Sequence, residues 1–180
     1  MLPAFVTALA FASRRHVGQL RKDGRTPYVN HLIEVCDVLV RDGRVGQVDV
    51  LMAAALHDTV EDTATTFDEI AQAFGDDVAG LVREMTDDTT LPRTERRRRQ
   101  VVHAPHLTDA AKLIKIADKI SNIRDVVRAP APDWSMDRRR DYLDWAERVV
   151  AGCRGVNAAL DAAFDATLRE GRTALGINER

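Results

Sequence analysis

The sequence contains little cysteine and few aromatic residues: two of its 180 residues are cysteine and 5% are aromatic. Cys36 and Cys153 lie far apart, which excludes a disulfide-rich scaffold and suits the reducing cytoplasm. We therefore expect both cysteines to pack as small apolar residues. No apolar run approaches the ~18 residues that a membrane-spanning helix requires, so no membrane partner is expected.

An excess of positive charge is also absent. The chain carries 26 Lys and Arg residues against 28 Asp and Glu residues, a formal net charge of -2 at pH 7. No overall positive field is thus available to hold nucleic acid or an anionic membrane. An anionic ligand must instead be bound by a local group of cations.

The composition that remains is typical of a packed globular chain. Residues are 45% hydrophobic and 30% charged, and the ten glycines and six prolines are scattered rather than clustered. These values exclude collagen-like, low-complexity and disordered chains. The length, together with the lack of a linker-like segment, predicts a single domain over residues 1–180.

The apolar segment from Met1 to Ser13 has two interpretations, a secretory signal peptide and an amphipathic first helix. A signal peptide requires a preceding basic region, which is missing here, and a basic stretch follows the segment instead. The helical interpretation is favoured because the residues at helical spacing form one stripe. That stripe consists of Phe5, Leu9 or Ala8, Ala12 and His16.

Apolar residues recur with the helical period along most of the chain, and no alternating β-branched run bounded by turn signals appears. The sequence therefore predicts an all-α fold of about eight to ten helices. Thr26 is expected to cap the second helix, with Pro27 at its first position. The buried stripe of this helix is predicted to be Val29, Leu32, Ile33, Cys36, Leu39 and Val40.

Start and stop signals predict the later helices. Thr66 and Glu69 have the spacing of a capping box, and Gly75 is a C-terminal stop. Thr108 is the expected cap of a long helix. The predicted elements are Val48–Leu56, Thr66–Phe74, a short helix with Val78 to Met85, a basic segment Arg93–Val102, Thr108 to about Val127, about Asp133–Ala151 and Gly155–Arg169.

The most unusual local string runs from Ala53 to Thr63, where an apolar helix leads into His57, Asp58, Glu61 and Asp62. Residues four apart share one face of a helix. If the helix continues for another turn, Glu61 therefore lies over His57, and Asp62 over Asp58. Two acids would then stand beside two potential metal ligands.

His31 and Asp118 are candidates for further donors of a site for Mn²⁺, Fe²⁺ or Zn²⁺. Asp118 interrupts an apolar pattern, on a polar stripe shared with Lys115, Asn122 and Asp125. Each residue alone is more often structural, because a lone histidine usually makes core or surface hydrogen bonds and a helical aspartate usually faces solvent. The combination is more specific than its parts.

A separate histidine, a His-Asp pair and a later helical aspartate together resemble the ligand set of the HD superfamily of metal-dependent phosphohydrolases. With Glu61 and Asp62 added, the sequence resembles the RelA/SpoT hydrolase domains, and more closely the small alarmone hydrolases typified by the metazoan form. The resemblance covers almost the whole chain. It is carried by Arg21-Lys22, Thr26 to His31, Ala53 to Thr63, Phe74-Gly75, Thr86 to Asp88, Thr90 to Arg93, Lys112 to Asp125, Trp134, Arg138, Tyr142 and Trp145.

The resemblance implies an HD-domain helical fold around a metal site. It also implies a Mn²⁺-dependent 3′-pyrophosphohydrolase that converts ppGpp or pppGpp to GDP or GTP and pyrophosphate, with Zn²⁺ or Fe²⁺ as alternative metals. Glu61 and Asp62 match the catalytic acidic pair, which is expected to orient or deprotonate the attacking water and to assist the leaving group. The residues that match the metal ligands are His31, His57, Asp58 and Asp118.

A small-molecule nucleotide substrate carries several negative charges, so cations must surround the pocket. The resemblance implies that Arg21 and Lys22 lie near the nucleobase. For both, an exposed solubilising role is the alternative. The residues expected to contact the substrate are Arg21, Lys22, Tyr28, Arg93, Asn122, Arg138 and Tyr142.

The arginine run from Arg93 to Arg99 suggests a nucleic-acid site, but it lacks Trp and Tyr and the chain is slightly acidic overall. Successive arginines point in different directions around a helix. Most are therefore expected to face solvent, with Arg93 nearest the phosphate groups. His103 and His106 lack a partner motif and are expected at the surface.

Two other functions stay open at this point. The same metal centre is compatible with another phosphorylated nucleotide, such as removal of the 2′-phosphate of NADPH. A non-catalytic nucleotide-binding HD module is the other alternative, for which loss of one ligand or of the Glu61-Asp62 pair is expected, and neither is lost. None of these patterns predicts the oligomeric state.

Overall fold

The computed structural model describes residues 2–177. Within this range the chain forms ten α-helices and one 3-10 helix, which confirms the predicted all-α class. Met1, the start of the predicted first segment, and residues 178–180 of the predicted domain lie outside the described residues. The helices are α1 (Leu2–Arg15), α2 (Val29–Arg41), α3 (Val48–Leu56), α4 (Thr59–Asp62), α5 (Phe67–Phe74), α6 (Asp76–Met85), α7 (Arg93–His103), η1 (Ala104–His106), α8 (Asp109–Arg128), α9 (Met136–Ala151) and α10 (Ala158–Ala174).

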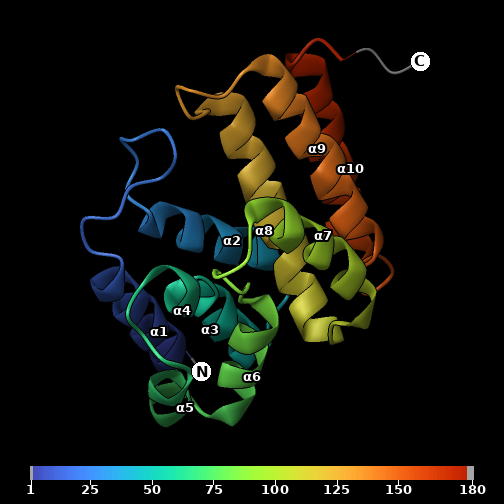
Figure 1. Cartoon of the computed structure of the whole chain (residues 1–180). Coiled ribbons are helices and arrows are strands. Elements are labelled where there is room, and N and C mark those ends of the chain that lie inside the picture. Colours follow the sequence, from blue (N-terminus) through green and yellow to red (C-terminus); the bar gives the residue numbers. More distant parts are fainter. Residues whose placement is uncertain (1, 178–180) are drawn as a thin grey trace.

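The long helix α8 runs through the middle of the molecule (Figure 1). It packs against α2, α3 and α6 from the first half of the chain and against α9 and α10 from the second half. Isoleucines along it, such as Ile116 and Ile120, are fully buried. Because α8 is covered on most sides, polar residues such as Asp118 are carried into the interior with it.

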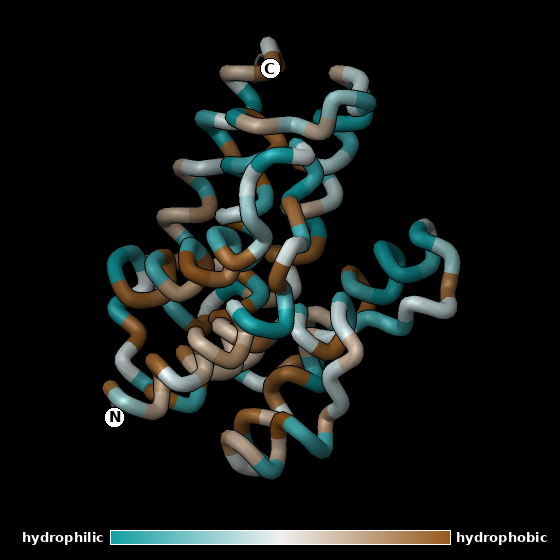
Figure 2. Tube along the Cα trace, turned by 90° about the vertical axis from the view of Figure 1, so that its left-hand side faces the viewer, coloured by the Kyte–Doolittle hydropathy of each residue, from teal (hydrophilic) through white to brown (hydrophobic). Residues whose placement is uncertain are grey.

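Helix α3 is buried along almost its whole length, from Val50 to Leu56. Burying each large apolar side chain of this kind stabilises the fold by roughly 2 kcal/mol. Most other helices have one apolar face, and Figure 2 shows hydrophobic and hydrophilic residues alternating along them. The packing of α3 fixes the position of the residue that follows it, His57, which is also buried.

The first helix follows the predicted stripe, because Ala8, Ala12 and His16 are buried. Within residues 2–177, no helix combines the length and the apolar composition that crossing a membrane requires. Cys36 and Cys153 are both buried free thiols, as predicted.

Local capping signals have mixed outcomes. The capping box of Thr66 and Glu69 is present, and the Thr108 side chain accepts a hydrogen bond from Ala111 N. The predicted cap at Thr26 is wrong, because α2 begins at Val29. Asp23 accepts hydrogen bonds from the backbone and the hydroxyl of Thr26, so this threonine closes a turn before the helix.

The predicted stripe of α2 is also partly wrong. Ile33 and Val40 are 49% and 47% exposed, whereas Val35 and Val38 are buried. Since α2 packs mainly against α8 and α3, the face toward these helices is the buried one.

The last two helices begin later than predicted, each behind a side-chain cap. The Ser135 hydroxyl accepts from Arg138 N, so α9 begins at Met136. The Asn157 side chain accepts from Leu160 N, and α10 extends to Ala174.

Candidate metal centre and substrate cleft

One cavity of about 580 Å³ collects the residues predicted for the site. Its size is within the range of small-molecule binding sites. The predicted residues that line it are Arg21, Lys22, Tyr28, His31, His57, Asp58, Glu61, Asp62, Arg93, Asp118, Asn122, Arg138 and Tyr142, which is the whole predicted set.

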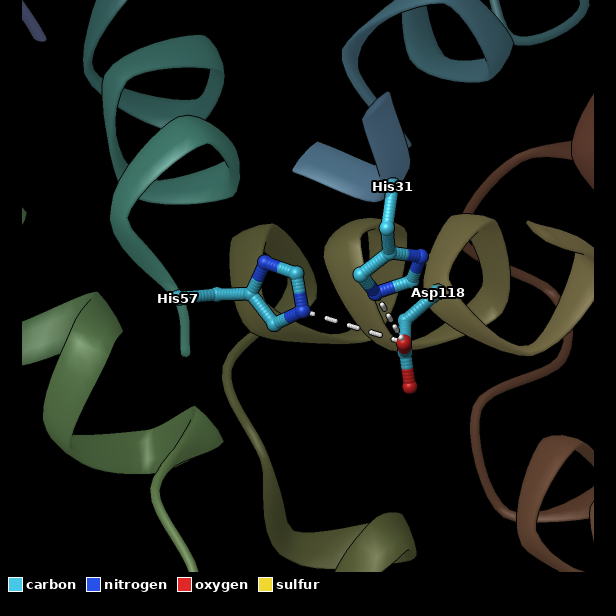
Figure 3. Close-up of side chains that lie close together, drawn as sticks. All are labelled: His31, His57 and Asp118. Carbon is cyan, nitrogen blue, oxygen red and sulfur yellow. Dashed lines mark ion pairs between the residues drawn. The ribbon is translucent and has the colours of Figure 1, made fainter. Parts of the chain in front are cut away.

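Three buried side chains from separate helical segments converge in this cleft (Figure 3). His31 comes from α2, His57 directly follows α3, and Asp118 comes from α8. One donor atom of each lies within 4.8 Å of the others. The Nε2 atoms of His31 and His57 are 3.3 and 3.7 Å from Asp118 Oδ1.

Asp58 adds a second carboxylate to these groups. Its Oδ2 lies 3.1 Å from His57 Nε2 and 3.6 Å from His31 Nε2. The predicted helix over Val48–Leu56 is present as α3, and the chain resumes helical structure in α4 from Thr59. Asp58 nevertheless keeps right-handed helical backbone angles, φ -97° and ψ -3°, and Asp62 N donates a hydrogen bond to Asp58 O at 2.9 Å, so the expected i, i+4 relation of Asp62 to Asp58 is retained.

Hydrogen bonds on the far side of each imidazole orient its Nε2 toward the carboxylates. His57 Nδ1 lies 2.8 Å from Ala54 O, which requires a proton on Nδ1. His31 Nδ1 lies 2.9 Å from Ser121 Oγ, and the Ser121 hydroxyl donates to Glu34. This arrangement assigns the Nδ1–H tautomer to both rings, and it is typical of metal-binding histidines.

The donor set fits a divalent cation. His57 Nε2 is buried and has no hydrogen-bond partner within residues 2–177. With Nδ1 protonated, its lone pair faces the oxygens of Asp58 and Asp118, an arrangement of acceptors that requires a positive charge between them. His31, His57 and Asp118 therefore form a potential metal-binding triad.

The pKa values report the same electrostatics. Burial alone would lower the pKa of His57, but the neighbouring Asp58 and Asp118 carboxylates raise it to about 10. Burial lowers the pKa of His31. Burial opposes ionisation of Asp118, yet the Lys119 ammonium holds its pKa well below the usual range. The carboxylates thus stabilise positive charge between them, whether a proton or a metal ion carries it.

Asp118 is held in place by two neighbours on α8. Its Oδ2 accepts a hydrogen bond from Lys119 Nζ at 2.8 Å, and its Oδ1 accepts one from the Asn122 amide. The Lys119 ammonium also lies 4.6 Å from the centre of the Trp145 ring. Our sequence analysis missed Lys119, although a lysine beside the aspartate of a largely apolar helix was a visible signal.

Glu61 is fixed from two other segments. Its Oε2 accepts a hydrogen bond from Asp87 N at 2.9 Å, and its Oε1 lies 3.2 Å from Arg96 Nη1. Burial, followed by the charge of Asp58, raises the pKa of Glu61 to about 7 despite the hydrogen bond from Asp87. Desolvation and the charge of Asp58 also raise the pKa of Asp62. Glu61 can therefore take up and release a proton near neutral pH.

Cations gather around Trp134 at the other end of the cleft. The charged groups of Lys22, Arg93 and Arg138 lie 5.5, 5.6 and 4.6 Å from its ring centre. Arg21 is held by Asp125 and by the Asn122 carbonyl, each through a 2.8 Å hydrogen bond.

Tyr28 and Asn122, two of the residues expected to contact the substrate, line the cleft and also make hydrogen bonds within the protein. The Tyr28 hydroxyl donates to Asp58 at 2.6 Å. The amide of Asn122 joins Arg21 to Asp118. Both residues thus also position their neighbours in the cleft.

The arginine run divides by helical face, and Arg93, the member expected nearest the phosphate groups, lines the cleft. Arg96 and Arg97 also line the cleft, because residues three and four positions apart share a face of α7. Arg98 and Arg99 instead pair with Glu95 on the exposed side. His103 and His106 are exposed, as predicted.

The cleft of this all-helical domain contains two imidazoles and two carboxylates. Along the sequence they occur in the order His, His-Asp, Asp, and this combination defines a recognisable class of protein. The pattern of the HD domain family matches residues 8–143 of this chain. The chain belongs to the HD domain family, which confirms the predicted fold and the predicted resemblance.

Individual relatives share most of the chain. It is 49% identical over 159 residues to the Xenopus tropicalis guanosine-3′,5′-bis(diphosphate) 3′-pyrophosphohydrolase MESH1, covering 88% of this chain and 89% of the relative. It is also 49% identical over 158 residues to the human MESH1 of the same name, covering 87% and 88%. A solved structure described as a metazoan orthologue of SpoT that hydrolyses ppGpp superposes with a TM-score of 0.89 at 44% identity, covering 93% of this chain and 94% of the other.

Proposed function

We propose that this protein is a metal-dependent hydrolase that removes the 3′-pyrophosphate of ppGpp or pppGpp to give GDP or GTP and pyrophosphate. The observation that carries the proposal is the buried triad of His31, His57 and Asp118 in the same cleft as Glu61 and several cations. The names of the relatives, which are 3′-pyrophosphohydrolases of this nucleotide, support the choice of substrate.

We assign His31, His57, Asp58 and Asp118 as the metal ligands, with Mn²⁺ as the expected ion and Zn²⁺ or Fe²⁺ as alternatives. A divalent ion bound there lowers the pKa of a coordinated water and offsets charge on the attacked phosphoryl group. The neutral imidazoles and the two carboxylates are donors that these metals accept.

Glu61 and Asp62 divide the proton transfers in this proposal. Water forms the new bond to the phosphorus attached to the ribose 3′-oxygen, and the bond between that phosphorus and the 3′-oxygen breaks. Glu61, with a pKa of about 7, accepts the proton of the water. Asp62, whose pKa is raised, donates a proton to the departing 3′-oxygen.

The cations hold the rest of the nucleotide. Arg21 and Lys22 are assigned to the nucleoside end, with Arg93, Arg138 and Tyr142 beside Trp134 at the same end. Guanidinium and ammonium groups suit the 5′-phosphates of the substrate. Tyr28 and Asn122 are assigned to contact the nucleotide, and their hydrogen bonds also orient Asp58, Asp118 and Arg21.

The decisive experiment combines metal analysis of the purified protein with identification of the products formed from ppGpp. We expect one bound divalent metal per chain and release of GDP and pyrophosphate. Asp118→Asn should remove metal and turnover together, whereas Glu61→Gln should keep the metal and lose turnover. Arg98→Gln, on the exposed face of α7, is the matched control. A higher kcat/KM for NADPH than for ppGpp would overturn the assigned substrate.

A further inference from the structure

Lys115 on α8 is a buried residue whose ammonium makes no hydrogen bond or ion pair with residues 2–177. The residue is only 5% exposed. The nearby Lys119, in contrast, binds Asp118. Burial, followed by the charge of Lys119, lowers the pKa of Lys115. A charged group in this position destabilises the fold unless an anion meets it.

Lys115 lies in the wall of the cleft that contains the metal donors. It precedes Asp118 by three residues and so shares a face of α8 with it. Arg96 and Gln100 line the same part of the cleft. Arg96 Nε and Gln100 Oε1 are likewise buried and have no hydrogen-bond partner within the described part of the chain. Three polar side chains at this end of the cleft thus have unused hydrogen-bonding capacity.

The neighbouring cavities define two ends of the cleft. A small cavity adjoins it at Arg21, Lys22 and Trp134, the end assigned to the nucleoside. A second cavity, of about 190 Å³, adjoins it at Lys115, Arg96, Gln100 and Asp87, and its outer lining includes Glu84 and Asp88. The Asp87 carboxylate accepts a hydrogen bond from the Gln100 amide. These two cavities share no lining residue. In the proposed function the reacting phosphorus lies at the metal donors and the nucleoside lies at the Arg21 end of the cleft. The outer 3′-phosphate then extends toward the Lys115 end.

We infer that Lys115, together with Arg96, binds the outer phosphate of the 3′-pyrophosphate and holds the pyrophosphate after it is released. The inference rests on the proposed function. Hydrolysis transfers the oxygen of water to the phosphorus attached to the 3′-oxygen, so the pyrophosphate product stays at the Lys115 end while the nucleotide remains at the Arg21 end. Asp118 and Asp87 act on Lys115 only through their charges, and a phosphate oxygen supplies the direct hydrogen-bond partner that its ammonium lacks.

The test compares Lys115→Met with Lys112→Met in the metal-loaded protein. Methionine keeps the apolar length of the side chain and removes the charge. Lys112 is one turn away on α8 and lines none of the three cavities. The probe is inorganic pyrophosphate, measured by calorimetry and by its inhibition of ppGpp hydrolysis, with GDP as a second ligand.

For Lys115→Met we expect pyrophosphate to bind about tenfold to hundredfold more weakly, with a similar loss in kcat/KM for ppGpp and unchanged binding of GDP. The melting temperature should stay the same or rise, because an unpaired buried charge has been removed. Lys112→Met should match the wild type in all of these measurements.

Three results would overturn the inference: unchanged pyrophosphate affinity in Lys115→Met, a marked fall in its melting temperature, or no pyrophosphate binding by the wild type at millimolar concentration. The second result would mean that the lysine stabilises the fold. Failure of the wild type to hydrolyse ppGpp would instead refute the proposed function, so the two failures are distinguishable.

Discussion

Replacing Glu61 by glutamine should make the metal-free protein more stable at neutral pH and nearly inactive when metal is restored. The pKa of Glu61 is raised from 4.5 to about 7, and each pKa unit corresponds to about 1.4 kcal/mol. The ionised carboxylate is therefore destabilised in the folded state by about 3 kcal/mol at most. Because the side chain is 18% exposed and Arg96 lies 3.2 Å away, we expect about 1 to 3 kcal/mol.

The direction of this stability change follows from the protonation of Glu61 in the folded and unfolded states. At pH 4 the Glu61 carboxyl group is largely protonated in the folded and in the unfolded chain. Wild type and variant should therefore differ little in their free energy of unfolding at this pH. As the pH rises from 4.5 to 7, the unfolded chain releases this proton while the folded chain keeps it, and the free energy of unfolding of the wild type falls. Above pH 7 the difference is constant. Because glutamine cannot ionise, the free energy of unfolding of the variant does not fall in this way as the pH rises.

The assay is urea unfolding with a chelator present, at pH 5, 6, 7 and 8. The gain in unfolding free energy of Glu61→Gln over wild type should grow across this range by about 1 to 3 kcal/mol. In the Mn²⁺-loaded enzyme the same variant should lose about 10² to 10⁴ in kcat. Glu170→Gln, at an exposed position of α10, is the control. Equal gains at pH 5 and pH 8 would refute the reasoning.

Three further predictions concern the metal site and the fold. Ser121→Ala breaks the link between His31 and Glu34 and should weaken metal binding about 10- to 100-fold by calorimetry; unchanged affinity would contradict this role. Mn²⁺ at a hundred times its Kd should raise the unfolding free energy by about 2.7 kcal/mol, but not in Asp118→Asn. Gly152→Ala places a Cβ 2.8 Å from Pro105 Cδ and should lower the free energy of unfolding by about 1–3 kcal/mol, measured as a lower urea midpoint; a wild-type midpoint would contradict it.

Elements encoded by neighbouring residues could be predicted from the sequence. The Thr66–Glu69 capping box works because both partners are three residues apart and need no distant contact. Thr26 carries an equally good capping signal, but Asp23 competes for its hydroxyl and the helix starts later. Local patterns alone do not reveal which of two nearby partners a side chain will choose.

In the candidate site, too, some features could be predicted from the sequence and others depend on tertiary packing. The residue types and their order pointed to the His57-Asp58 pair, and the structure brings all the predicted residues to one cleft. The helical periodicity of α7 did not show which face meets the cleft, so Arg96 was missed. The link from His31 through Ser121 to Glu34 joins α2 and α8 and depends on how these helices pack. Such contacts follow from tertiary packing, which periodicity does not specify.

The converging donors have a consequence for how the molecule opens. His31, His57 and Asp118 belong to segments that are distant in the chain but adjacent in space, so an ion bound to them would act as a removable cross-link between the N-terminal helices and α8. Partial unfolding that separates these segments must release the ion first. Amide hydrogen exchange in α2, in α3 and in the middle of α8 should therefore slow together when metal is added, while the outer turns of α10 exchange at their former rate.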